Sequence, residues 1–106
     1  MAEWVDVAGV SDIEPGTYRV VDVDDVMIAV FNIDGDIFAI EDVCTHDYST
    51  LTGGPINGCE ITCPRHGARF NIKTGEALCA PAYEAVTTFP VQIEGDTIRV
   101  MDDRWD

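Results

Sequence analysis

The sequence predicts an all-β protein, and two observations indicate this class. Two pairs of short strand-like segments are each joined by a two-residue turn signal, and no window of the chain shows sustained helical periodicity. The 106 residues suit one domain with a modest core, without internal repeats or linker-like segments. We therefore expect a single small antiparallel β domain over residues 1–106.

Strand patterns occur in three parts of the chain, and two of these are hairpins. Asp34-Gly35 and Gly95-Asp96 are the turn signals of the hairpins, because such pairs tolerate the positive φ angles of tight two-residue turns. The expected strands are residues 18–23, 26–31, 37–40, 91–94 and 97–100. The aromatic residues expected in the core are Trp4, Phe31, Phe38 and Phe89.

Other segments predict little regular structure. Ser11 and Glu14 have the spacing of a helix-capping box, but Pro15 limits any helix there to one turn. Residues 42–85 contain several turn signals and few strand patterns, so this region is expected to consist largely of loops.

The charge is strongly negative and unevenly distributed. Six Lys and Arg face twenty Asp and Glu, which gives a formal net charge of −14. Nucleic acid and anionic membrane surfaces are therefore excluded as partners, since both attract clustered basic residues. The acidity favours solubility, steered encounters with basic protein patches, or both.

The N-terminal residues have neither the basic region nor the apolar run of a signal peptide. No apolar stretch approaches the roughly 20 residues of a membrane span. The protein is therefore expected to be cytoplasmic. In that reducing compartment, four cysteines favour metal or redox chemistry over a disulfide framework.

Two cysteine–histidine pairs form the main candidate site. Cys44 and His46 have C-x-H spacing, and Cys63 and His66 follow after a further sixteen residues with C-x-x-H spacing. Thiolates favour soft metals, and imidazole suits iron and zinc. A structural zinc site is the alternative reading, although zinc modules usually begin with two cysteines two to four residues apart.

The two motifs resemble those of the Rieske iron–sulfur family, and the resemblance extends over nearly the whole chain. Ala80-Pro81-Ala82 lies where the family has a proline-containing loop over the cluster. The resemblance implies stacked antiparallel sheets and one [2Fe–2S] cluster. It implies that Cys44 and Cys63 hold one iron and that His46 and His66 hold the other. The outer imidazole nitrogens would then face the redox partner.

The sequence departs from the high-potential Rieske proteins of respiratory complexes. Ser49 and Arg65 stand where those proteins have two further cysteines, and Gly67-Ala68 stands where they have a serine that hydrogen-bonds the cluster. With fewer hydrogen bonds to stabilise the reduced cluster, the reduction potential is expected near the low end of the Rieske range, about −150 mV.

The resemblance is greatest to the ferredoxin component of bacterial aromatic-ring-hydroxylating dioxygenase systems. It implies a soluble one-electron carrier between an NAD(P)H-dependent flavin reductase and the Rieske centre of a terminal oxygenase. No catalytic residues, no small-molecule substrate and no enzymatic activity are expected, because the chain lacks both a dinucleotide-binding glycine pattern and spare histidines for an oxygen-activating iron. Association rates with both partners are expected to fall as ionic strength rises.

Two alternatives of function remain open at this stage. One is the Rieske-like small subunit of an assimilatory nitrite reductase, and the other is a β module that binds structural zinc. Cys59 and Cys79 are expected to be buried small hydrophobic residues, with a disulfide between them as the alternative. Arg65 could orient a partner carboxylate or be a solvated loop charge, and Tyr48 and Pro81 could form a docking rim or shield the cluster.

Overall fold

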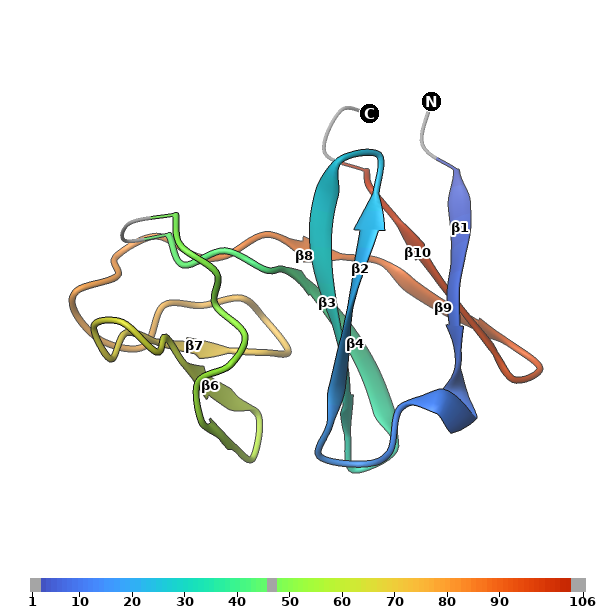
Figure 1. Ribbon diagram of the computed structural model, residues 1–106, viewed down its shortest axis with the longest axis horizontal. Coiled ribbons are helices and arrows are strands. Elements are labelled where there is room, and N and C mark those ends of the chain that lie inside the picture. The colour runs from blue at the N-terminus through green and yellow to red at the C-terminus, as the bar shows by residue number, and fades with distance from the viewer. Residues whose placement is uncertain (1–2, 46–47, 104–106) are drawn as a thin grey trace.

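The computed structural model describes residues 3–45 and 48–103. The chain forms three antiparallel sheets, which confirms the predicted all-β class. In Figure 1 the smallest sheet lies to the left of the two larger ones, and the long loops gather at that end. No helix in the described part of the chain is long and apolar enough to span a membrane.

The two larger sheets contain the predicted hairpins. Each predicted turn pair, Asp34-Gly35 and Gly95-Asp96, connects two antiparallel strands. The first sheet has the order β1-β10-β9, with β1 at Trp4–Gly9, β10 at Thr97–Met101 and β9 at Val91–Glu94. The second has the order β2-β3-β4-β8, with β2 at Tyr18–Val23, β3 at Val26–Ile33, β4 at Asp36–Glu41 and β8 at Thr88–Phe89.

The third sheet lies within the region predicted to be rich in loops. Its order is β5-β6-β7, with β5 at Ile56–Asn57, β6 at Glu60–Thr62 and β7 at Arg69–Asn71. These strands have only two or three residues each, so they are too short for an alternation of apolar and polar residues to be recognised in the sequence.

Strand β3 is shared by two hydrophobic cores, and this explains its continuous apolar sequence. Ile28 and Val30 belong to the core that includes residues of the first sheet, whereas Ala29 and Phe31 belong to the core that includes residues of the third. A strand buried on both faces loses the alternation of a half-exposed strand. The core that contains Ala29 and Phe31 extends to the candidate site, since Cys44 and Cys63 also belong to it.

The N-terminal segment differs from the prediction in two ways. Trp4 is 38% exposed on β1, so it is not a core residue. The single helical turn is a 3₁₀ turn, η1 (Val10–Asp12), and begins before the predicted Ser11–Glu14 box. The Gly9 amide donates to Asp12 Oδ2 over 3.0 Å, and the Ser11 hydroxyl donates to Asp96 on the β9–β10 turn.

Candidate metal centre

The two cysteines of the predicted ligand set are both buried in the same core. Cys44 is 0% exposed after β4, and Cys63 is 1% exposed after β6. His66 is exposed on the loop that follows Cys63. His46 lies outside the described residues, and in the described part of the chain no three metal-ligating side chains form a group.

The first ligand loop is closed by two backbone hydrogen bonds on Cys44. The Cys44 amide donates to the carbonyl oxygen of Ser49 over 2.8 Å. The amide of Tyr48 donates back to the carbonyl oxygen of Cys44 over 2.7 Å. These two bonds therefore fix the backbone of Cys44 at the start of its loop.

The second ligand loop repeats this pattern at the same offsets. The Cys63 amide donates to the carbonyl oxygen of Ala68, five residues later, over 2.7 Å. The amide of Gly67, four residues after the cysteine, donates to the carbonyl oxygen of Cys63 over 3.1 Å. The backbones of the two loops thus have the same hydrogen-bond pattern. In the sequence, the histidine follows its cysteine by two residues in the first loop and by three in the second.

The fourth residue after each cysteine has a left-handed backbone. Gly67 has φ 77° and Tyr48 has φ 60°. Glycine adopts this conformation without a steric penalty, whereas a bulky side chain there costs about 1–3 kcal/mol. Tyr48 is 74% exposed, so burial of its ring within this chain does little to offset that strain.

Asp42 connects the first ligand loop to the segment that follows it. Its Oδ1 accepts hydrogen bonds from the amides of Leu51 over 3.1 Å and Thr52 over 2.7 Å. Its Oδ2 accepts one from the Thr52 hydroxyl over 2.8 Å. Asp42 was not among the residues that the motifs indicate, yet its carboxylate fixes both ends of the loop that begins at Cys44.

We expect Asp42→Ala to lower the free energy of unfolding by about 2 kcal/mol, because it leaves two half-buried amide donors without their acceptor. Chemical denaturation of the purified protein measures this loss. Asp22→Ala is the matched control, since Asp22 accepts from the Asp25 amide on an exposed turn, and it should change stability by less than about 0.5 kcal/mol. Equal effects of the two variants would contradict the role given to Asp42.

The segment that contains Pro81 lies against both ligand loops. The Thr45 hydroxyl donates to the carbonyl oxygen of Glu84 over 2.7 Å, which connects this segment to the first loop. The Cys79 thiol lies 3.7 Å from the carbonyl oxygen of Gly67, which connects it to the second. In Figure 1 the segment that contains Pro81 is orange and the first ligand loop continues into the bright green segment, and both lie at the left of the view.

Cys59 and Cys79 are not joined by a disulfide, so the alternative prediction for this pair is not confirmed. Both are half-buried rather than buried, which corrects the prediction for their exposure. A hydrogen bond from the Arg69 side chain lowers the pKa of the Cys79 thiol, and Arg69 also pairs with Glu60 over 3.1 Å.

Comparison with known proteins identifies the family. Residues 3–90 match the family described as Rieske [2Fe-2S] domain. The chain belongs to the Rieske family. It therefore carries one [2Fe–2S] cluster, and the predicted resemblance is confirmed. The chemistry of the donor set fits this group, because the two buried thiols can supply thiolates and the exposed imidazole of His66 lies at the surface.

Several relatives are Rieske ferredoxins over almost their whole length. The ferredoxin component of the naphthalene 1,2-dioxygenase system of Pseudomonas putida is 39% identical over 101 residues, which cover 95% of each chain. The 3-phenylpropionate/cinnamic acid dioxygenase ferredoxin subunit of Escherichia coli (strain K12) is 40% identical over 90 residues, 84% of each chain. The ferredoxin of carbazole 1,9a-dioxygenase from Nocardioides aromaticivorans IC177 has a TM-score of 0.87 at 30% identity, over 92% of this chain and 95% of that one.

The negative charge of this Rieske domain is concentrated away from the ligand loops. Residues 42–85 contain five acidic and three basic residues, a net charge of −2. The remaining residues, which form the two larger sheets and the termini, contain fifteen acidic and three basic residues, a net charge of −12. The end of the molecule that carries the loops is therefore close to electrically balanced.

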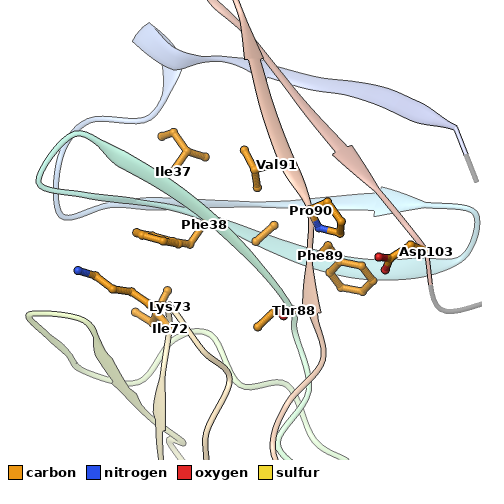
Figure 2. Close-up of a pocket in the computed structure, with 10 residues that line it drawn as sticks. Ile37, Phe38, Ile72, Lys73, Thr88, Phe89, Pro90, Val91 and Asp103 are labelled. Atoms are coloured by element: carbon orange, nitrogen blue, oxygen red, sulfur yellow. The ribbon is translucent and has the colours of Figure 1, made fainter.

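A shallow groove of about 440 Å³ lies between the second sheet and the turn after β7 (Figure 2). Most of its lining residues are apolar, but the surface that they expose to the groove is about half polar, and its charged side chains among the described residues are Lys73 and Asp103. The Lys73 ammonium lies 5.7 Å from the centre of the Phe38 ring. Substrate sites usually combine an apolar pocket with several convergent polar groups, and neither buried cysteine lines this groove. We therefore assign it no substrate.

Proposed function

We propose that this Rieske domain is a one-electron carrier of an aromatic-ring-hydroxylating dioxygenase system. It would receive electrons from an NAD(P)H-dependent flavin reductase and pass them to the Rieske centre of a terminal oxygenase. The observation that supports this most directly is the near full-length similarity to ferredoxin components of such systems. A similar ferredoxin, 35% identical with a TM-score of 0.86, has been solved in a complex with the oxygenase of carbazole 1,9a-dioxygenase.

The ligand set that we propose is Cys44 and Cys63 on one iron and His46 and His66 on the other. When bound, the cluster supplies a site that accepts and releases one electron. The buried positions of Cys44 and Cys63 would keep water away from the thiolate side, while His66 on the surface would place an imidazole edge within reach of a partner protein. This arrangement suits electron transfer between proteins.

The proposal extends to the setting of the protein. We propose one domain over residues 1–106 and a cytoplasmic location, in which the thiols of Cys59 and Cys79 would stay reduced. Catabolism of an aromatic hydrocarbon is the pathway type to which such a carrier would contribute.

The visible absorption and EPR spectra of the purified protein, before and after dithionite, test the assignment. We expect a red-brown protein whose reduced form gives a rhombic signal with an average g value below that of all-cysteine [2Fe–2S] clusters. A colourless protein with stoichiometric zinc would overturn the proposal. Stable co-purification with a large haem-containing chain would instead favour a nitrite reductase subunit.

A further inference from the structure

Among the residues that the structure describes, the most exposed large hydrophobic side chains lie at the end with the ligand loops. Tyr48 is 74% exposed and Tyr83 is 84% exposed. The other large hydrophobic side chains with substantial exposure are only 36–47% exposed, and these are Trp4, Tyr18, Met27 and Ile93. Exposed aromatic rings are enriched where proteins bind one another, so their location is informative.

Hydrogen bonds hold the two tyrosines beside the proposed ligands. The Tyr48 amide bonds the carbonyl oxygen of Cys44, so this tyrosine belongs to the first ligand loop itself. Tyr83 precedes Glu84, whose carbonyl oxygen accepts from the hydroxyl of Thr45 in the same loop. Both rings therefore stand on backbone that is fixed to the loop of Cys44 and His46.

The strained backbone and the exposed ring of Tyr48 favour a contact of this ring with a molecule outside this chain. The second ligand loop has Gly67 at the same place, with the same hydrogen bond and a similar positive φ. A glycine would thus satisfy this loop plan without strain. A tyrosine that is strained and exposed contributes little to folding, and such outliers concentrate at functional sites.

The charge distribution indicates what kind of surface could cover these rings. Residues 42–85 have a net charge of only −2, while the rest of the chain has −12. The loop end can therefore approach another protein closely without strong charge repulsion, and its exposed aromatic rings favour an apolar counterpart. The acidic sheets at the far end would act mainly on the rate of encounter.

We propose that Tyr48 and Tyr83 form a docking face for the terminal oxygenase, and that the oxygenase presents a largely apolar surface around its own Rieske centre to this face. This inference rests on the proposed function and adds which side chains hold the complex together. The two rings should slow dissociation, whereas the acidic residues should speed association and make it salt-dependent.

Stopped-flow transfer from the dithionite-reduced protein tests the docking face. The probes are the terminal oxygenases of the Pseudomonas putida naphthalene system and of the Escherichia coli 3-phenylpropionate/cinnamic acid system, whose ferredoxins are similar to this chain. Tyr48→Gly and Tyr83→Ser are expected to raise the half-saturating concentration about tenfold each. The slope of the rate against ionic strength should stay the same. Ile93→Ser is the control, because Ile93 is 45% exposed on the β9–β10 hairpin at the opposite end (Figure 1).

The outcomes separate the docking face from the proposed function. Tyr48→Gly should retain its EPR signal and unfold at no lower temperature than the parent, since glycine relieves the strained backbone. Unchanged half-saturation in either tyrosine variant, or an equal loss in Ile93→Ser, would overturn the paired docking face. If the reduced parent protein transfers electrons to neither oxygenase, the proposed function fails instead.

Discussion

Cys63→Ser is expected to abolish binding of the [2Fe–2S] cluster. A serine hydroxyl stays protonated at neutral pH. The variant therefore loses one of the two thiolates that are proposed to hold the same iron, those of Cys44 and Cys63. The side chain is 1% exposed within the core shared by the second and third sheets. Backbone hydrogen bonds of the Cys63 amide and carbonyl groups fix the loop that carries this thiol. Iron and acid-labile sulfide content, together with the visible spectrum, measure the loss.

The other cysteines supply matched controls for this prediction. Cys44→Ser should lose the cluster in the same way, because Cys44 is 0% exposed in the equivalent loop. Cys59→Ser and Cys79→Ser should retain it, since both thiols are half-buried and lie outside the two motifs. A Cys63→Ser protein with full iron and sulfide content would refute the proposed ligand set. Loss of the cluster from Cys79→Ser would assign that thiol a role that its position beside Gly67 does not indicate.

The elements that could be predicted from the sequence are those specified by neighbouring residues. Both hairpins follow from a turn pair between two apolar or alternating segments, and the structure confirms them. The long apolar run of β3 is consistent with a strand buried on both faces, and the two cores on either side of Ala29 and Val30 explain it.

The elements that could not be predicted depend on contacts between distant residues. Strand β1 pairs with β10, whose residues lie 88 to 97 positions later in the chain, and no local pattern indicates that pairing. The same holds for Asp42 in the candidate site, because its role comes from the amides of Leu51 and Thr52 rather than from a motif.

In the ligand loops, too, one feature could be predicted from the sequence and another could not. The spacing of cysteines and histidines in the sequence predicted a metal centre, and the resemblance of the two motifs to those of Rieske proteins indicated its family. The common backbone plan of the two loops was not visible, since Tyr48 and Gly67 are chemically unlike and share only their φ angle.

Gly54→Ala is expected to displace the backbone on both sides of Cys63. A Cβ atom on Gly54 would overlap the carbonyl oxygen of Thr62 and lie 3.2 Å from the nitrogen of Pro64. These two residues flank Cys63, so the added methyl group can be accommodated only by moving the backbone that carries a proposed ligand. We expect a loss of about 3 kcal/mol in the free energy of unfolding, near the upper end for overpacking, and a lower iron content.

Gly58→Ala separates this steric effect from the general effect of replacing a glycine. Gly58 has φ 62° and no atom within 4 Å of the position that a Cβ would occupy, so the variant is strained but not overpacked. It should lose about 1 kcal/mol of stability and keep its full iron content. Denaturation and iron analysis of both variants would therefore give a large loss of both quantities for Gly54→Ala and a small loss of stability alone for Gly58→Ala. If Gly54→Ala retained full iron content and lost no more stability than Gly58→Ala, the close approach of Gly54 to Thr62 would not be what fixes the backbone around Cys63.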